Sequence, residues 1–176
     1  MVAVDDRLFI FGGVGDQPRV SLEYLPASDT WQRLAPMPAE REHLAAAVVD
    51  GRVYVIGGRW GDRGNLRVVE EYDPATDSWR TRAPMPTARG GLTAATLDGR
   101  IHVLGGEAFD PARTFADHEV YTPATDRWEA APPLPTARHG LASAALDSRL
   151  YVIGGGRTAG LSVSPLTEIY LESSDE

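Results

Sequence analysis

Three arginines recur along the sequence at positions from which their side chains could bind a ligand. Arg41, Arg89 and Arg138 each lie five residues after the first proline of a Pro-x-Pro sequence. The guanidinium group of arginine presents several donors in a fixed plane, which serves ligand recognition and structural ion pairs equally well. Two interpretations therefore stay open: contact with a ligand, or capping of loop carbonyls and pairing with an acid of a neighbouring unit.

Four further residues stand out, because Arg59, Trp60 and Glu107 lie in segments that vary in length and His139 directly follows Arg138. Trp60 departs from the spacing of the other tryptophans and follows Arg59, so it is the best single candidate for a contact residue, although it could instead cover the base of a loop. Glu107 and His139 are the only acid and base we expect near the same surface. The predicted ligand-binding face thus comprises Arg41, Arg89, Arg138, His139, Arg59, Trp60 and Glu107.

The residue types that are missing exclude several kinds of chemistry. There is no Cys, and all 17 cationic residues are Arg, so disulfides, thiolate nucleophiles, Cys-ligated zinc and lysine Schiff bases are excluded. The histidines lack the spacing of a metal site, and His102 occupies a strand position that holds Phe or Tyr in other units. We expect no catalytic residue, no metal and no cofactor.

The net charge and the distribution of apolar residues argue against two classes of partner. A net charge of −8 makes the chain a poor general binder of nucleic acid or of an anionic membrane. No apolar run approaches the length of about 18 residues that suggests a membrane span, and residues 1–13 do not resemble a signal peptide. We expect neither a nucleic-acid nor a membrane partner, and the cellular compartment stays open.

A repeat of 48 or 49 residues positions all of these side chains. Each unit has a Gly-Gly pair, then a Tyr, and in three units a Trp seven residues after the Tyr. Only the step from Gly-Gly to Tyr changes in length. We expect the periodic residues to be structural, with the tryptophans in the core between units: Gly12, Gly13, Gly57, Gly58, Gly105, Gly106, Gly154, Gly155, Tyr24, Tyr72, Tyr121, Tyr170, Trp31, Trp79 and Trp128.

Each unit predicts four short antiparallel strands. Asp-Gly pairs such as Asp50-Gly51 predict tight hairpins, since Gly supplies the positive φ that such turns require. Successive loops of a meander lie at alternate ends, so the arginine loops and the variable loops should share one face. The variable segments are residues 14–20, 59–67, 107–117 and 156–164.

The repeated residues resemble the kelch repeat. The second unit fits in full, with Gly57-Gly58, then Glu71-Tyr72-Asp73-Pro74-Ala75-Thr76, then Pro84-Met85-Pro86-Thr87-Ala88-Arg89. The first unit departs at residues 25–28 and the third at Thr122 and Leu134, through conservative changes. The resemblance implies a β-propeller that serves as a binding platform, and it implies that an Arg at this position often contacts acidic ligands.

Residues 1–176 are expected to form one all-β propeller segment of about four blades. The predicted blades span approximately 1–35, 41–83, 89–132 and 138–176. The repeat places Met1 within a first strand and the next Trp at position 177, so the outer strand of the fourth blade should be missing. We interpret the chain as part of a larger, six-bladed ring, with a four-bladed ring as the alternative. Open blade edges should favour self-association.

Three classes of function fit this sequence. We favour a noncatalytic module that presents loops on one propeller face to a protein or peptide. A fragment of a carbohydrate-active enzyme, such as a sugar epimerase or mutarotase, is the second, with Glu107 and His139 as its candidate acid or base. The third is a purely architectural segment of a longer propeller.

Overall fold

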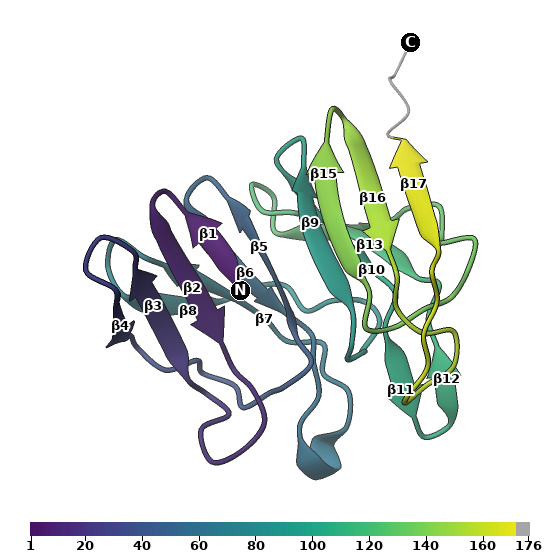
Figure 1. Ribbon diagram of the computed structural model, residues 1–176, viewed down its shortest axis with the longest axis horizontal. Helices are drawn as coiled ribbons and strands as arrows, with labels where there is room; N and C mark the ends of the chain where they lie inside the picture. The colour runs from purple at the N-terminus through teal and green to yellow at the C-terminus, as the bar shows by residue number, and fades with distance from the viewer. Residues whose placement is uncertain (172–176) are drawn as a thin grey trace.

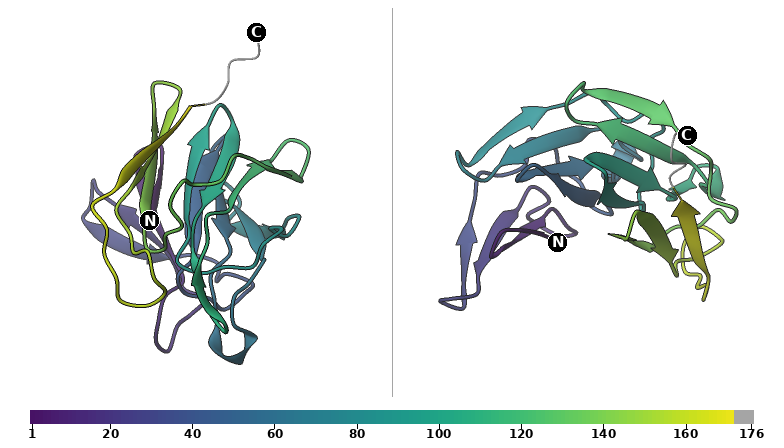
Figure 2. Two further views of the ribbon diagram at one scale, coloured as in Figure 1. Left: turned by 90° about the vertical axis from the view of Figure 1, so that its right-hand side faces the viewer. Right: turned by 90° about the horizontal axis from the view of Figure 1, so that it is seen from above.

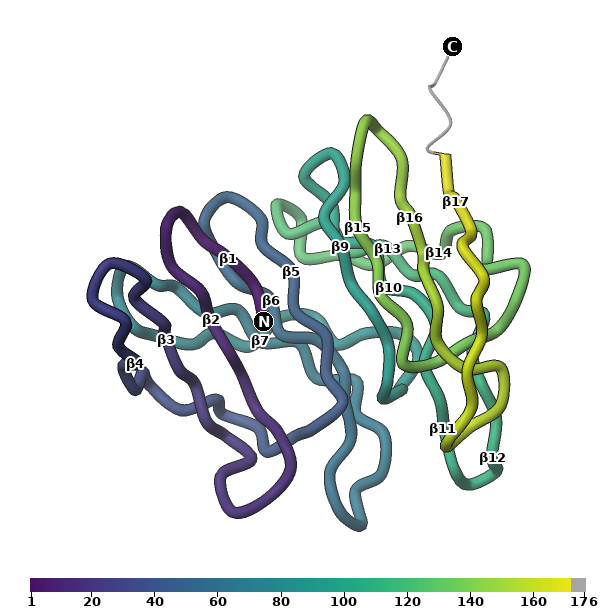
Figure 3. Tube along the Cα trace, viewed as in Figure 1, coloured from purple at the N-terminus to yellow at the C-terminus, as the bar shows by residue number. Residues whose placement is uncertain are grey.

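Antiparallel strands rich in β-branched and aromatic residues form nearly all of the regular structure. The computed structural model describes residues 1–171. Four consecutive sheets form propeller blades that follow one another along an arch (Figures 1 and 2). The continuous Cα trace in Figure 3 shows each blade as a meander that leads directly into the next one.

The blades share one strand order. Blade 1 contains β1 (Val2–Val4), β2 (Arg7–Phe11), β3 (Ser21–Leu25) and β4 (Thr30–Arg33). Blade 2 contains β5 (Ala45–Val49), β6 (Arg52–Ile56), β7 (Val69–Asp73) and β8 (Ser78–Thr81). Blade 3 contains β9 (Thr93–Leu97), β10 (Arg100–Leu104), β13 (His118–Thr122) and β14 (Arg127–Ala130). Blade 4, within residues 1–171, contains β15 (Ala142–Leu146), β16 (Arg149–Ile153) and β17 (Thr167–Leu171). The predicted all-β propeller of kelch-type blades is confirmed.

Two variable segments carry regular structure that the sequence does not predict. A 3₁₀ turn, η1 (Gly61–Arg63), lies between β6 and β7. The hairpin of β11 (Glu107–Phe109) and β12 (Ala112–Thr114) lies between β10 and β13. Both project from the same end of the blades, at the bottom of Figure 1.

The core lies between the blades rather than within one sheet. Val4, Phe9 and Phe11 of blade 1 pack against Val53 and Val55 of blade 2, and equivalent clusters fill the next two junctions. Neighbouring blades among residues 1–171 therefore bury the faces that they turn toward one another. Blades 2 and 3 have both neighbours, which explains why Val53, Ile56, Ile101 and Val103 are fully buried.

Two kinds of contact join successive blades, and the first is a backbone hydrogen bond from the Gly-Gly pair. Gly106 donates its N–H to the carbonyl of Arg138 in the next blade at 2.8 Å, and Gly58 does the same to Arg89 at 3.1 Å. The preceding glycine, Gly105, has a φ of +64°, and a Cβ atom there would lie 2.5 Å from the Arg138 carbonyl oxygen. The Gly-Gly pair is therefore required both by its backbone conformation and by the approach of the next blade.

The periodic Tyr and Trp residues form a second inter-blade contact, with Asp77 and Asp126 at its centre. Asp77 accepts a hydrogen bond from Tyr72 Oη at 2.8 Å and one from the Ala35 N–H of blade 1 at 2.9 Å. Trp79 Nε1 donates to the Ala35 carbonyl at 2.9 Å, and Trp128 Nε1 donates to the Ala83 carbonyl at 3.0 Å. These bonds satisfy polar atoms that the junction would otherwise bury unpaired.

The prediction that all three periodic tryptophans lie between blades is wrong for Trp31. Its side chain is 52% exposed, whereas Trp79 and Trp128 pack into the junctions before blades 2 and 3. Within residues 1–171 no blade packs against the outer face of blade 1, so Trp31 contacts only Tyr24 among the aromatic residues, at a ring distance of 5.0 Å. Within the same residues, no helix is both long and apolar enough to span a membrane.

Candidate functional site

The arginine loops and the variable loops meet at one end of the blades. Isolated bridges pair Glu42 with Arg59, Gly90 with Glu107, and His139 with Gly156. Neighbouring arginine loops are also joined, because Gly91 donates to the His43 carbonyl at 2.8 Å and Gly140 to the Gly91 carbonyl at 2.7 Å. The segments therefore form one continuous loop face on blades 2, 3 and 4.

Arg59 connects the loops of blades 2 and 3. Its Nε donates to Glu42 at 2.9 Å, and its Nη1 donates to Glu107 Oε1 at 2.9 Å. Its Nη2 lies 3.0 Å from His43 Nε2. The guanidinium also lies over the Phe109 ring, 4.9 Å from the centroid, at a distance that allows a cation–π interaction. Because every nitrogen of this guanidinium has a partner, its position is fixed by the protein itself.

Glu107 is the second connecting residue. Its side chain is nearly buried, at 4% exposed, and its two oxygens bind different blades. Oε1 pairs with Arg59, while Oε2 lies 3.3 Å from His139 Nδ1 and accepts the Gly160 N–H at 2.8 Å. His139 Nε2 in turn lies 3.0 Å from the Thr158 carbonyl. One carboxylate thereby holds the loops of blades 2, 3 and 4 together.

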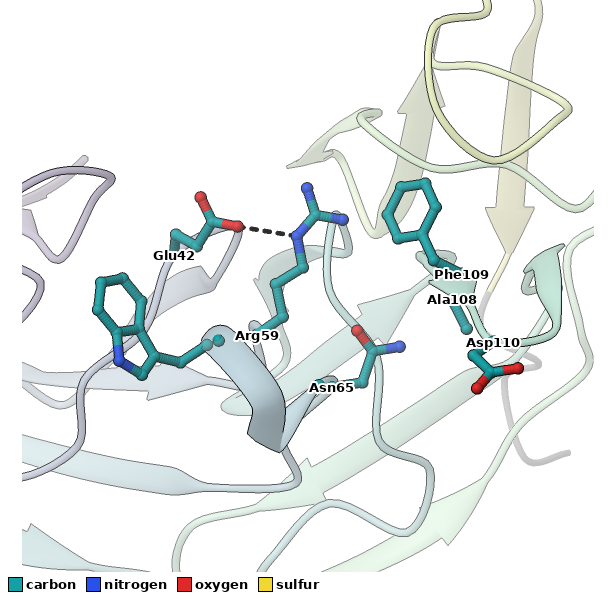
Figure 4. A pocket seen from close by; sticks show the side chains of 9 residues that line it. Glu42, Arg59, Asn65, Ala108, Phe109 and Asp110 are labelled. Carbon is teal, nitrogen blue, oxygen red and sulfur yellow. Dashed lines mark hydrogen bonds and ion pairs between the residues drawn. The ribbon is translucent and has the colours of Figure 1, made fainter.

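A pocket of about 420 Å³ opens between the loops of blades 2 and 3. Figure 4 shows Arg59 between Glu42 and Phe109, with Asn65 below and Asp110 at the far side. The lining consists of Glu42, Arg59, Trp60, Gly61, Gly64, Asn65, Ala108, Phe109 and Asp110. Phe109 is 54% exposed and Trp60 is partly exposed, so two aromatic side chains are available to a ligand beside a fixed ion-pair network.

Four of the residues predicted from the sequence lie in this region of the structure, and they have different roles. Arg59 and Trp60 line the pocket. Glu107 and His139 lie beneath the loop surface and hold it in place, since both are buried. Phe109, Asn65 and Glu42 were not predicted. Glu42, directly after Arg41, has no counterpart in the other units, where Gly90 and His139 follow the arginine, and Phe109 lies in one of the variable segments.

The expectation that Arg41, Arg89 and Arg138 contact a ligand does not agree with their positions, because all three are fully buried. Arg41 donates to Glu70 Oε2 at 2.6 Å and to the Val68 carbonyl at 2.9 Å. Arg89 pairs with Glu119 at 2.6 Å, and Arg138 pairs with Glu168 at 2.7 Å. The structural interpretation therefore applies, with one correction: the acid lies in the same blade as its arginine.

In the Arg41–Glu70 pair, burial and the charge of the partner shift the pKa of each group in opposite directions. Removal from water raises the pKa of the Glu70 carboxyl, and the neighbouring Arg41 guanidinium acts in the opposite direction. Burial likewise lowers the pKa of Arg41 while Glu70 acts to raise it. The Nε atoms of all three arginines are buried without a partner among residues 1–171, so the pairs are not fully satisfied. The sequence holds a signal for the acids, since a Glu stands two residues before Tyr in three of the four units.

A pair of histidines occupies the junction of blades 3 and 4. His102 Nδ1 lies 2.9 Å from His118 Nε2, and His118 Nδ1 lies 3.1 Å from the Pro132 carbonyl. The His118 ring packs edge-on against Tyr170 of blade 4, with 4.7 Å between ring centroids. Burial, followed by the proximity of His118, lowers the pKa of His102 to about 4, so His102 is neutral at pH 7. Burial also lowers the pKa of His118. His102 is a packed strand residue, as its position in the repeat predicts.

Comparison with known proteins agrees with the repeat. A family model described as the KLHDC2/KLHL20/DRC7 Kelch-repeats domain matches residues 1–161. Kelch-like protein terF of Aspergillus terreus is 37% identical over 62 residues, which cover 31% of this chain and 14% of that protein. Kelch-like protein 22 of Rattus norvegicus is 34% identical over 71 residues, covering 37% of this chain and 11% of that protein.

A third relative is similar over about a third of the chain. Beta-scruin of Limulus polyphemus is 36% identical over 61 residues, covering 33% of this chain and 7% of that protein. The chain therefore matches only a small part of the length of each of these curated relatives. The family model, in contrast, covers most of the chain, and a kelch-repeat domain agrees with the antiparallel propeller blades described above. The chain belongs to the kelch-repeat family.

Proposed function

We propose that the chain is a noncatalytic interaction module that binds a protein or peptide segment at the pocket between the loops of blades 2 and 3. The observation that carries the proposal is the arrangement around Arg59. A guanidinium with a partner on each nitrogen holds two loops in place, and the partly exposed Trp60 and the exposed Phe109 lie beside it. Preorganised loops and aromatic anchors favour binding because little conformational entropy is lost.

The arrangement favours binding over sugar chemistry. A general acid or base must reach the substrate within hydrogen-bond distance. Glu107 is nearly buried, and both of its oxygens already accept hydrogen bonds from the protein. His139 is buried, and its two nitrogens face Glu107 and the Thr158 carbonyl.

Selection of binders from a displayed library of random peptides tests this proposal. We expect peptides that bind the chain, and we expect Trp60→Ala to weaken their binding at least about tenfold, as is common for an aromatic anchor. Trp31→Ala is the matched control, because Trp31 is exposed but lies in β4, the outer strand of blade 1. Failure to select any peptide, or equal binding by the Trp60→Ala variant, would contradict the proposal.

A further inference from the structure

The pocket between the loops of blades 2 and 3 has one arginine in its lining, and the charge of that arginine is already compensated. Arg59 is the only arginine among the described residues that line the pocket, and the sequence contains no Lys. Its Nε lies 2.9 Å from a Glu42 oxygen, its Nη1 lies 2.9 Å from a Glu107 oxygen, and its Nη2 faces His43. An acidic ligand, which the kelch resemblance implies, therefore meets no uncompensated positive charge in this pocket.

The histidine beside this network adds no positive charge in this arrangement. A guanidinium nitrogen only donates hydrogen bonds, so His43 Nε2, which lies 3.0 Å from Arg59 Nη2, acts as the acceptor. The proton of the neutral ring is then on Nδ1, which lies 3.2 Å from Glu42 Oε2 and donates to it. Glu42 itself stays ionised: burial acts to raise its pKa, but the pKa is lowered overall, with the hydrogen bond from Arg59 as the largest opposing cause.

Two carboxylates in the lining can accept a hydrogen bond from a ligand. Asp110 lies in the turn between β11 and β12 and is exposed, and its carboxylate has no hydrogen bond or ion pair with another described residue. A carboxylate offers about four acceptor positions, and Glu42 uses one with Arg59 and one with His43. Both acids therefore have acceptor capacity left for a ligand.

Charged residues beside the pocket do not reverse this excess of acid. Asp62 and Arg63 lie together on η1 and have opposite charges. Arg113 lies on the other strand of the hairpin, with its guanidinium 4.6 Å from the centroid of the Phe115 ring. None of these three charged residues lines the pocket. The pocket therefore presents more negative than positive charge to a ligand.

The aromatic side chains of the pocket favour a ligand of positive charge. The face of an aromatic ring attracts Lys and Arg, and the indole of Trp does so most strongly. Phe109 already makes such a contact, because the Arg59 guanidinium lies 4.9 Å from its ring centroid. Trp60 lines the pocket and is partly exposed, and within residues 1–171 its ring contacts no cation and no other aromatic ring. The indole is therefore available to a cation from outside the chain.

We propose that the occupant of this pocket is a basic protein segment, with a Lys or Arg side chain that lies against Trp60 and pairs with Glu42 and Asp110. The inference rests on the proposed function, which is binding of a protein or peptide at the pocket, and adds the charge of the partner. The long apolar stem of a basic side chain packs against an aromatic ring while its charged end reaches a carboxylate. An acidic side chain in the same place lies against two carboxylates and is repelled.

The displayed library of random peptides also tests the charge of the partner. Peptides recovered on the wild-type chain but not on the Trp60→Ala variant are sequenced, so that only peptides that need the pocket are counted. We expect Arg and Lys to be enriched at least about threefold over the unselected library, and Asp and Glu to be depleted. The recovered peptide of highest affinity is then labelled with fluorescein and titrated with the 176-residue chain, and its fluorescence anisotropy is measured. Replacement of its basic residue by Leu should weaken binding at least about fivefold.

Removal of one carboxylate from the pocket provides the matched pair of variants. Asp110→Asn should weaken binding of the labelled peptide by about two- to fivefold, as expected for an ion pair near the surface. Asp98→Asn makes the same change of charge in the turn between β9 and β10, at the opposite end of blade 3, where Asn tolerates the positive φ of 49°. This control should leave the affinity unchanged, which separates pairing in the pocket from a general attraction to an acidic chain.

The outcomes distinguish this inference from the proposed function on which it rests. Recovered peptides without an excess of basic residues, or equal affinities of the Asp110→Asn and Asp98→Asn variants, would overturn the preference for a basic partner while the binding at the pocket stands. Enrichment of Asp and Glu would overturn it in the same way. Recovery of no peptide that depends on Trp60 would contradict the proposed function itself, and this inference with it.

Discussion

A buried guanidinium is stable only when its charge and its donors are satisfied nearby. In each of blades 2, 3 and 4, the arginine before the first strand reaches across the blade to a Glu on the third strand, at 2.6–2.7 Å. Removing one partner of such a pair leaves an uncompensated buried charge, whereas replacing both with apolar residues can cost little. The repeated arginine is thus a structural residue whose role depends on an acid 29 or 30 positions later.

Substitution of Glu70 tests this dependence. We expect Glu70→Gln to lower the free energy of unfolding by about 3 kcal/mol, because Arg41 stays buried without its counter-ion. The double variant Arg41→Met/Glu70→Leu should recover much of that loss. Urea denaturation measures both. A Glu70→Gln chain as stable as wild type would show that the carbonyl contacts of Arg41 alone are sufficient.

The paired histidines predict a pH-dependent stability. The pKa of His102 is about 4 in the fold, below the ordinary value of 6.5, because burial disfavours the imidazolium. The unfolded chain therefore binds a proton more readily, and stability is lost as pH falls from about 6.5 towards 4. We expect this loss to amount to about 2–3 kcal/mol at most.

His102→Phe isolates that effect, since Phe9 occupies the same position in blade 1. Chemical denaturation at pH 7 and pH 4.5 gives the two stabilities. The variant should lose less stability than wild type over this interval, and the difference between the two chains removes the contribution of carboxylates. An equal loss in both would contradict a role for the histidine pair.

At the scale of strands and turns, much of the structure follows from local sequence signals. The Asp-Gly hairpins have positive φ at both positions, 48° at Asp50 and 72° at Gly51, as their residue types predict. The continuous apolar runs of β5 and β6 predict strands, and in the structure β6 is buried on both faces from Val53 onward, whereas buried and partly buried residues alternate along β5. The sequence does not reveal the structure of the variable loops, because the β11–β12 hairpin and the network around Arg59 depend on contacts between residues 16 to 53 positions apart.

The arginines show why site prediction is harder than fold prediction. Their regular spacing identifies them as part of the repeat. Whether they are exposed depends on whether each side chain points toward the loop face or into the blade, and the sequence alone left both possibilities open. Trp31 shows the converse. It has the residue type and spacing of a core position, but burial requires a neighbouring blade, which the described residues do not provide.

A pair of glycines tests the inter-blade contact. Gly105 and Gly154 have nearly the same φ, +64° and +67°, but a Cβ would lie 2.5 Å from the Arg138 carbonyl oxygen at Gly105 and no closer than 3.8 Å to any atom at Gly154. Gly154→Ala should cost about 1 kcal/mol from the left-handed backbone alone. Gly105→Ala should cost about 2–3 kcal/mol more, through displacement of blade 4. Thermal unfolding measures both, and equal costs would mean that the junction adapts easily.

At the scale of the whole molecule, the arch exposes an outer face on the last described blade. Leu146, Ile153, Ile169 and Leu171 are between 47% and 62% exposed. Their counterparts in blade 2, such as Val49 and Ile56, are buried against blade 3. Contiguous apolar surface of this kind favours association.

Self-association of the 176-residue chain is therefore a prediction at this scale. Sedimentation velocity should show a weight-average mass that rises with protein concentration. Ile153→Glu should reduce that rise, because it places a charge in the centre of the outer face, while Leu161→Glu, an exposed loop residue, should not. A monomer at every concentration would contradict the prediction.

The position of the buried ion pairs also bears on how such a protein can evolve. In blades 2, 3 and 4, the Arg and its Glu belong to one unit, whereas each buried Trp relies on a carbonyl of the unit before it. A tandem duplication of one unit therefore copies both members of the ion pair together and never creates an unbalanced internal charge. The same event supplies each new Trp with an acceptor, because any preceding unit presents the same carbonyl. Units of this design can be gained one at a time, and each intermediate remains electrostatically self-sufficient.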